Sequence, residues 1–252
     1  MTAKIVSNKL YGSPGFERYG FLSLYAPDIS ETFKPGQFVM ISAGETWEPL
    51  LRRPFSPYGV DNSQIHILYQ AVGRGTRLLQ HQQNTLSVSL PLGSSFSVTR
   101  GRKAALVAGG VGLAPIRFLA DALKDSGIVL YYGANKEDDL FYPFLTEDVK
   151  YRRVVCTADG SFGTAGFVTD AFQRDAGNFN YVYCCGPKAM TDKVTAICRQ
   201  RGIPLEISVE EVMACGVGVC GGCLIDIPAN PAKSAKKVRC CTEGPVFKIA
   251  PQ

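Results

Sequence analysis

The sequence predicts an antiparallel β region, then an α/β region, then a short cysteine-rich segment. Residues 1–99 carry β-branched and aromatic residues at strand-like spacing, with Pro-Gly and Asp-Asn turns between the candidate strands. Residues 100–208 alternate strand-like and helix-like stretches, which is typical of a parallel sheet covered on both faces. Residues 209–252 contain five of the nine cysteines, so a bound cofactor is expected there.

The candidate elements follow this order along the chain. In residues 1–99 the strands are YGFLSLYAP, GQFVMIS, SQIHILYQAVG and NTLSVSLPLG, and no long segment has helical period, which predicts an antiparallel barrel or sandwich. In residues 100–208 we expect strands at AALVAG, IVLYYGAN, YRRVVCTA, NFNYVYCCG and PLEISVE. Helices are expected from Ala114 to about Ser126 and over KAMTDKVTAICRQRG. The last 44 residues are too few to be stabilised by burial alone, which again points to a cofactor.

Composition excludes several classes of protein. The chain has 252 residues, of which 46% are hydrophobic, so general disorder is excluded. A net charge of +5 is too small to argue for nucleic-acid binding. We find no apolar stretch typical of a signal peptide or a spanning helix, and we therefore expect a cytoplasmic protein. In a reducing compartment, clustered cysteines indicate metal binding rather than disulfides.

The cysteine spacing carries the strongest signal. Cys215, Cys220 and Cys223 form C-x4-C-x2-C, and a fourth cysteine follows at Cys240 or Cys241. Plant-type 2Fe–2S proteins use this spacing with a distant fourth cysteine. Neighbouring glycines permit the close backbone path that such a loop needs. Structural zinc is the alternative, although zinc sites favour two spaced pairs and Cys240-Cys241 is an adjacent pair.

Four further motifs suit phosphate or ring binding, although each also has an ordinary structural explanation. Gly109 to Pro115 lies between a strand and a helix, where glycines let a backbone approach a pyrophosphate. An RRPFSP stretch and a GRGT stretch combine arginine with a hydroxyl. Cys185-Gly186-Pro187 ends an apolar strand, the place where ligands bind in open α/β sheets. The two histidines, His66 and His81, have no acid and serine near them in the sequence, so we predict no hydrolase triad.

The order RRPFS, GRGT, GGVGLAP and CCGPKAM resembles the ferredoxin–NADP reductase superfamily over residues 1–208. The strings EEVMACGVGVCGGC and CTEGPVF narrow the resemblance to electron-transfer subunits of class 1B dihydroorotate dehydrogenase, over the whole chain. The resemblance implies a flavin-binding β-barrel at 1–99, an NAD(P)-binding α/β domain at 100–208 and a small ferredoxin-like 2Fe–2S domain at 209–252.

The resemblance also implies roles for individual residues. FAD would be bound by Arg53, Pro54, Phe55, Ser56, Leu68, Tyr69, Gln70, Gly75 and Thr76. NAD(H) would be bound by Gly109, Gly110, Gly112, Pro115, Cys185 and Gly186, and the cluster by Cys215, Cys220, Cys223 and Cys241. Cys241 is favoured over Cys240 because it precedes Thr-Glu-Gly-Pro, as the fourth cysteine does in this family. The chain departs from the family at Gln70, where a basic residue is common.

Electron counting orders the three cofactors. Nicotinamide exchanges two electrons as hydride, a 2Fe–2S cluster carries one, and a flavin does both, so FAD belongs between them. No acid–base group for a carbon substrate is evident, so the resemblance implies an FMN-containing catalytic partner, in a heterotetramer of pyrimidine biosynthesis. We expect no membrane or nucleic-acid partner. The alternatives are a related flavin and iron–sulfur reductase subunit, of the ferredoxin:NADP reductase, sulfhydrogenase or anaerobic sulfite reductase type, and a colourless zinc-stabilised binding module. The sequence leaves NADH and NADPH equally open.

Overall fold

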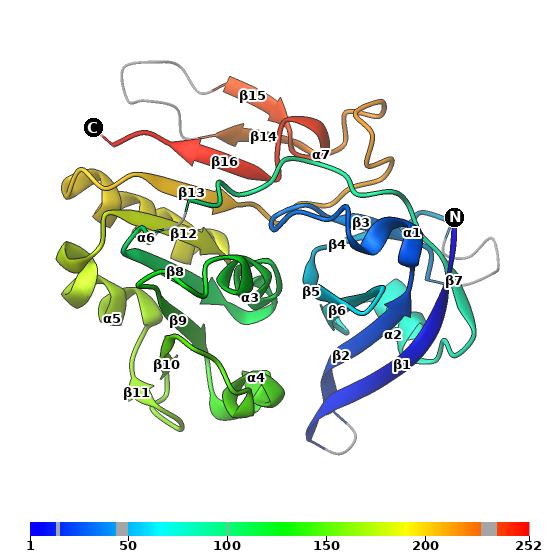
Figure 1. Cartoon of the computed structure of the whole chain (residues 1–252), viewed down its shortest axis with the longest axis horizontal. Helices are drawn as coiled ribbons and strands as arrows, with labels where there is room; N and C mark the ends of the chain where they lie inside the picture. Colours follow the sequence, from blue (N-terminus) through cyan, green and yellow to red (C-terminus); the bar gives the residue numbers. More distant parts are fainter. Residues whose placement is uncertain (14–15, 44–49, 100, 228–235, 252) are drawn as a thin grey trace.

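The computed structural model describes residues 1–13, 16–43, 50–99, 101–227 and 236–251, which form two bodies that lie side by side (Figure 1). The N-terminal body is built from antiparallel strands, and the second body is a layered α/β structure. The C-terminal strands lie along one edge of the molecule, next to both bodies (Figure 1). The predicted order of a β region before an α/β region is confirmed.

The N-terminal body is a barrel-like structure of antiparallel strands. Its main sheet has the strand order β5-β6-β2-β1-β7, and β3 pairs with β4 beside it. Isolated bridges from Phe38 to Leu92 and from Ile41 to Val88 connect the smaller pair to the chain around β7. The bounds are β1 Thr2–Ser13, β2 Phe16–Tyr25, β3 Val39–Ile41, β4 Arg53–Phe55, β5 Pro57–Asp61, β6 Gln64–Gln70 and β7 Thr85–Ser87, with helices α1 Pro27–Ser30 and α2 Arg74–Gln80.

The second body contains a seven-stranded sheet of order β11-β10-β9-β8-β12-β13-β16. All neighbouring strands run parallel except β16, which is antiparallel to β13. The strand bounds are β8 Ala104–Gly109, β9 Val129–Ala134, β10 Arg152–Thr157, β11 Thr164–Ala165, β12 Tyr181–Cys185, β13 Leu205–Ser208 and β16 Val246–Ile249. The helices are η1 Gly110–Gly112, α3 Leu113–Ala122, η2 Glu137–Asp139, α4 Tyr142–Thr146, α5 Val168–Asp175, η3 Ala176–Asn178 and α6 Lys188–Gln200.

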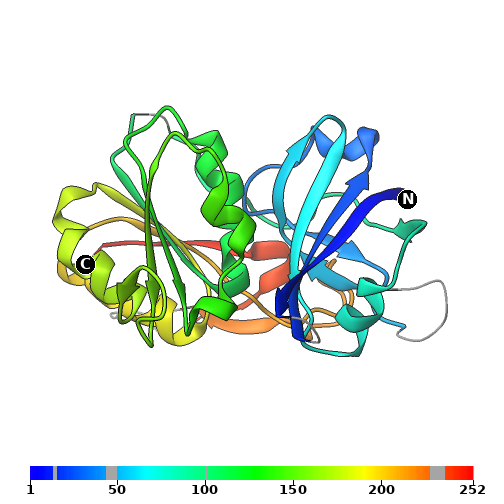
Figure 2. The same cartoon turned by 90° about the horizontal axis from the view of Figure 1, so that it is seen from below.

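Helices cover both faces of this sheet, as the alternating pattern predicts. On one face α3 shares a buried cluster with Tyr58 and Leu68 of the barrel, so this helix joins the two bodies. Figure 2 shows α3 standing between them. On the other face α5 and α6 pack against the sheet through residues such as Phe172 and Val194. The two bodies thus meet along α3 and at the carboxyl ends of the central strands.

Only part of the cysteine-rich segment forms a sheet of its own, and its last strand joins the α/β sheet. Strands β14 (Leu224–Ile227) and β15 (Lys236–Arg239) pair with each other, and the short helix α7 (Cys240–Glu243) follows them. The chain then enters the α/β sheet as β16, with Ser208 opposite Val246. No helix among the described residues is long and apolar enough to cross a membrane.

Two glycines of the barrel differ in the space around them, which gives a test of its packing. A Cβ on Gly20 of β2 would lie 2.0 Å from Cζ of Tyr69, and the Tyr69 ring cannot easily yield because it is buried and its hydroxyl donates to Asn8. We expect Gly20→Ala to lower the free energy of unfolding by about 1–3 kcal/mol, the usual cost of overpacking. A Cβ on Gly59 of β5 would meet no atom closer than 3.9 Å. Gly59→Ala should therefore change that free energy by less than about 1 kcal/mol. Chemical denaturation would compare the two variants, and equal effects would contradict this packing.

Candidate functional site

The first of two large cavities lies between the barrel and the end of β13, and its volume is about 570 Å³. That volume is in the usual range for a cofactor site. Its wall contains most of the residues predicted to bind FAD: Arg53, Pro54, Phe55, Ser56, Leu68, Tyr69, Gln70 and Thr76. Pro115 and Cys185, which were predicted to bind the nicotinamide dinucleotide, also line it. The structure thus brings together residues that lie more than 100 positions apart.

Arg53 lies against the first turn of α2, at one end of this cavity. A Cβ on Gly75 would lie 2.2 Å from Nε of Arg53, so the glycine makes room for the guanidinium. The Thr76 hydroxyl accepts from the backbone N–H groups of Val72 and Gly73, at 3.1 Å each. The same hydroxyl donates its proton to the carbonyl oxygen of Gly73 at 3.1 Å, so it fixes the start of α2. The groups suited to phosphate oxygens are therefore the Arg53 guanidinium and the backbone N–H groups in the first turn of α2.

Tyr69 forms an aromatic part of the same wall. Its ring packs edge-on against Phe55, with 6.1 Å between the ring centroids. Its hydroxyl donates to Oδ1 of Asn8 at 3.0 Å, and burial raises the pKa of Tyr69 to about 12. The phenol is therefore protonated at neutral pH, and because Tyr69 is fully buried in the barrel core, its ring supports the cavity wall from behind.

The second cavity, of about 510 Å³, opens at the carboxyl ends of β8 and β9. Gly109 and Gly110 line it at the turn from β8 into η1, Gly133 lines it near the end of β9, and Asn135 lines it just after that strand. The turn is close-packed, because a Cβ on Gly112 would lie 2.5 Å from the carbonyl oxygen of Cys185. Gly112 and Gly186 are not in either cavity wall but support this turn, since a Cβ on Gly186 would lie 2.9 Å from the nitrogen of Gly109.

Three residues line both cavities and so connect them: Gln70, Val111 and Glu210. Glu210 is exposed at the mouth of the cavities. The surrounding walls nevertheless keep much of the water away from its carboxyl group, which raises the pKa of Glu210. A carboxyl group that takes up a proton more readily than usual therefore lies where the two cavities meet.

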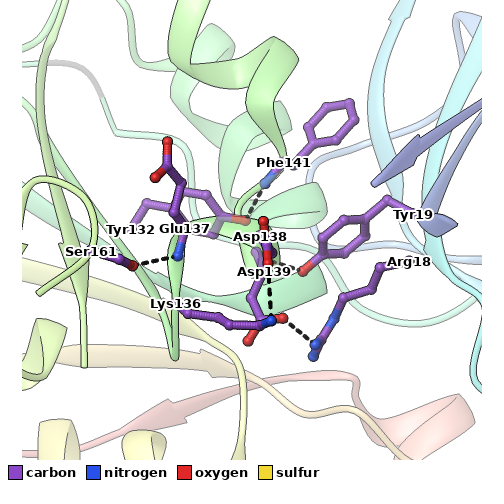
Figure 3. Close-up of polar contacts among 9 residues, drawn as sticks. All are labelled: Arg18, Tyr19, Tyr132, Lys136, Glu137, Asp138, Asp139, Phe141 and Ser161. Carbon is purple, nitrogen blue, oxygen red and sulfur yellow. Dashed lines mark hydrogen bonds and ion pairs between the residues drawn. The ribbon is translucent and has the colours of Figure 1, made fainter. Parts of the chain in front are cut away.

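Arg18 of β2 reaches the second cavity from the barrel (Figure 3). Its Nη1 donates to Oδ1 of Asp139 in η2, and Nε and Nη2 donate to the Gln70 amide oxygen at 2.5 and 2.8 Å when that amide faces them. The neighbouring Tyr19 hydroxyl donates to the Asp139 carbonyl at 2.9 Å. Lys136 pairs with Asp138 at 3.0 Å in the same loop, and it lines neither cavity.

The predicted cysteine loop begins at Cys215, two residues after Met213, which lines the first cavity. Backbone N–H groups point at its sulfur atoms: Cys220 N lies 3.5 Å from Sγ of Cys215, and Gly222 N lies 3.4 Å from Sγ of Cys220. The backbone N–H groups of Cys220 and Val217 lower the pKa of Cys215 to about 6. The loop therefore favours the thiolate form of Cys215.

Cys240 and Cys241, the two candidates for the fourth cluster ligand, direct their sulfur atoms differently. The sulfurs of Cys241 and Cys223 lie 3.3 Å apart, whereas Sγ of Cys240 points toward the carbonyl oxygen of Val209, 3.8 Å away. Burial raises the pKa of both thiols, to about 12 for Cys240 and about 11 for Cys241, so pKa does not separate them. Over the described ranges, no three His, Cys, Asp or Glu side chains gather closely enough to hold a single metal ion. In a 2Fe–2S cluster each iron has only two protein ligands.

Three side chains that the structure places in these cavities were not predicted from the sequence: Arg18, Glu210 and Phe167. The signal for Glu210 was present, because it lies two residues after β13 of the parallel sheet, at the end where ligands bind. Phe167 precedes α5, a helix that the patterns did not predict, and its ring is 62% exposed at the rim of the second cavity. Arg18 stands in a polar stretch with no motif around it.

Comparison with known proteins gives a consistent family. Residues 106–196 match the oxidoreductase NAD-binding domain, and residues 210–250 match the iron–sulfur cluster binding domain of dihydroorotate dehydrogenase B. The chain is 38% identical over 220 residues to the dihydroorotate dehydrogenase B (NAD+) electron transfer subunit of Clostridium acetobutylicum, covering 85% of this chain and 84% of that protein. It is 36% identical to the subunit of the same name from Geobacillus thermodenitrificans, covering 97% of this chain and 95% of that protein.

Solved structures agree with this result. The chain is similar to the structure described as an NADH-dependent reduced ferredoxin–NADP oxidoreductase, with a TM-score of 0.82 and 27% identity, covering 98% of this chain and 87% of that one. A ferredoxin reductase of carbazole 1,9a-dioxygenase shares the fold, with a TM-score of 0.69 and 22% identity over 82% of this chain and 68% of that one. On the sequence matches, the chain belongs to the family of dihydroorotate dehydrogenase B (NAD+) electron transfer subunits.

Proposed function

We propose that this chain passes electrons between NAD(H) and a catalytic dihydroorotate dehydrogenase subunit, through FAD and a 2Fe–2S cluster. The observation that carries the proposal is the continuity of the three sites. Glu210 lines both cavities, and the cysteine loop begins at Cys215, after the chain leaves the wall of the first cavity. Three sites that lie in contact along one path suit a chain of electron carriers.

The first cavity fits FAD by the chemistry of its walls. Arg53 would bind the phosphates through its guanidinium, and Gly75 and Thr76 through backbone N–H groups in the first turn of α2. Leu68, Tyr69 and Gln70 would line the flavin ring, with Pro54, Phe55 and Ser56 on β4 and just after it. The Tyr69 ring is buried in the barrel core and held by Asn8, so it would support the wall that the flavin contacts rather than stack on the flavin itself.

The second cavity fits a nicotinamide dinucleotide. Gly109 and Gly110 would approach its pyrophosphate, and Gly112 and Gly186 keep the turn close to the end of β12. Pro115 and Cys185 lie in the wall of the first cavity, so they would contact the nicotinamide where it meets the flavin. The exposed ring of Phe167 suits the opposite end of the cavity, where it would stack on adenine.

The cysteine loop fits an iron–sulfur cluster. Cys215, Cys220, Cys223 and Cys241 would be its ligands, and the backbone N–H groups directed at Cys215 favour its thiolate over its thiol. Positive φ angles at Gly216, Gly218 and Gly221 give the loop a path that other residues rarely adopt.

When FAD and the cluster are bound, the flavin would supply the exchange of two electrons with nicotinamide and of single electrons with the cluster. The chain itself supplies binding and positioning: the cavities hold the two ring systems near Glu210, and the cysteine loop leads to the surface of the molecule. Val217 and Val219 of that loop are 55% and 84% exposed, so the outlet of the path is open to a partner.

The partner that we propose is an FMN-containing catalytic subunit that oxidises dihydroorotate in pyrimidine biosynthesis, assembled with this chain as a heterotetramer. The names of the relatives and the iron–sulfur family match support a dihydroorotate dehydrogenase partner. We also propose a cytoplasmic location, because thiolate ligands require a reducing compartment. The domain limits that we propose are 1–99, 100–208 and 209–252.

An absorption spectrum tests the proposal. We expect anaerobically purified protein to contain iron and flavin, to be yellow-brown, and to lose its flavin absorbance when NADH is added. The same sample should contain no zinc. A colourless protein that contains zinc and does not respond to NADH would overturn the electron-transfer function.

A further inference from the structure

Arg18 is the cation that the barrel contributes to the second cavity. Its side chain is 41% exposed and forms part of the cavity wall, together with Gly109 and Gly110. We propose that Arg18 binds the pyrophosphate of the nicotinamide dinucleotide, and that Asp139 is its counter-ion when no dinucleotide is bound. This inference rests on the proposed function and names a residue that none of the sequence motifs contains.

The position of Arg18 follows from the barrel. In the pairing of β2 with β6, Tyr19 lies opposite Gln70, the last residue of β6. Arg18 therefore lies beside the end of β6, which contacts the η1 turn of the α/β body. Its Nε and Nη2 are held by the Gln70 amide oxygen at 2.5 and 2.8 Å. The guanidinium is thus positioned between the glycine turn after β8 and the place where the two cavities meet.

The contact between the two bodies does not depend on the charge of Arg18. The Phe141 ring stacks on Phe21 with 5.6 Å between centroids, and it meets Tyr11 and Tyr58 edge-on at 5.3 and 5.7 Å. The Tyr19 hydroxyl also donates to the Asp139 carbonyl at 2.9 Å. Because an aromatic cluster already joins the bodies here, the Arg18–Asp139 ion pair is not needed to hold them together, and the guanidinium would be able to exchange Asp139 for a phosphate.

The charges of the cavity wall favour Arg18 as the phosphate contact. Among the described residues, Lys193 is the other cation of the wall, and it is paired with Asp170 at 2.5 Å. A planar guanidinium matches two phosphate oxygens, which a single ammonium does not. The dinucleotide carries its negative charge in the pyrophosphate, so the turn and Arg18 would bind the same group from two bodies.

Asp139 would oppose this binding. Its side chain is only 8% exposed, it lies in the cavity wall, and it pairs with Arg18 (Figure 3). An anionic ligand must compete with this carboxylate for the guanidinium and is repelled by its charge. Removing the charge of Asp139 should therefore strengthen phosphate binding, whereas removing Arg18 should weaken it.

Calorimetric titration of the full chain, with its cofactors bound, tests this with ADP-ribose and adenosine as probes. We expect Arg18→Gln to weaken ADP-ribose binding by about ten-fold or more, the usual effect of a charge-assisted hydrogen bond to phosphate. Adenosine has no phosphate, so its affinity should change by less than about two-fold. Asp139→Asn should tighten ADP-ribose binding. Lys136→Gln is the control: it removes a cation from the loop that carries Asp139, and it should change neither affinity.

Each outcome decides the proposal. The proposal would be overturned if Arg18→Gln weakened the binding of ADP-ribose and adenosine equally, because Arg18 would then make no specific contact with phosphate. It would also be overturned if Lys136→Gln weakened ADP-ribose binding as much as Arg18→Gln does. If Arg18→Gln loses its flavin, Asp139→Asn decides alone: tighter ADP-ribose binding supports the proposal, and equal or weaker binding overturns it. A wild-type chain that does not bind ADP-ribose would overturn the dinucleotide site and the proposed function together, whereas normal binding by both wild type and Arg18→Gln overturns only this inference.

Discussion

Cys241→Ala is expected to lose the 2Fe–2S cluster, while Cys240→Ala keeps it. The two cysteines are adjacent and both are buried, so the pair forms its own matched control. Sγ of Cys241 lies 3.3 Å from Sγ of Cys223, in the predicted ligand set, whereas Sγ of Cys240 faces the carbonyl oxygen of Val209. Only one of two adjacent side chains points toward the loop, because the backbone turns between them in α7.

The readout is iron and inorganic sulfide per chain, with the paramagnetic resonance signal of the reduced protein. A 2Fe–2S site needs four protein ligands, so loss of one should remove most of the iron. Cys240→Ala should keep wild-type iron and lose only about 1 kcal/mol of stability, because a small buried side chain is removed. If Cys240→Ala loses iron and Cys241→Ala retains it, the fourth ligand is Cys240 and the assignment is wrong.

Arg53→Ala is expected to lose FAD while keeping its iron. The guanidinium lies against Gly75 at the start of α2, in the wall of the first cavity. A charge-assisted hydrogen bond to phosphate contributes about 1.5–3 kcal/mol, so flavin affinity should fall about 10- to 100-fold. Flavin content after gel filtration, and fluorescence titration of the flavin-free protein with FAD, measure the effect.

Two further variants separate the role of Arg53 from general effects on α2. Arg77 lies on the same helix, is exposed and lines neither cavity, so Arg77→Ala should bind FAD as wild type does. Gly75→Ala keeps the charge but places a Cβ 2.2 Å from Nε of Arg53, so the guanidinium must move and flavin affinity should fall. Wild-type flavin content in Arg53→Ala would show that the phosphates are bound elsewhere.

Several parts of the fold were predictable from local sequence. Strand β8 is a continuous apolar run, and α6 has an apolar face at helical spacing, so both patterns predicted their elements nearly to the residue. Strand β1 was not singled out, because Ser, Asn and Lys dilute its alternation and only Ala3 and Ile5 at its start are deeply buried. Helix α5 was also missed, since its eight residues include few strong apolar positions.

What the sequence determined by itself is the set of local chemical groups: a loop of cysteines at cluster spacing, glycines at the turn after β8, and Arg53 next to a hydroxyl on the barrel. These depend on neighbouring positions along the chain, so spacing alone reveals them. Tertiary structure decided which distant residues share a site. It brought β16 into the α/β sheet, turned Cys241 toward Cys223, and placed Arg18 beside Gln70. Such placements arise from strand register and from the packing of two bodies, and these long-range contacts leave no periodic trace in the sequence.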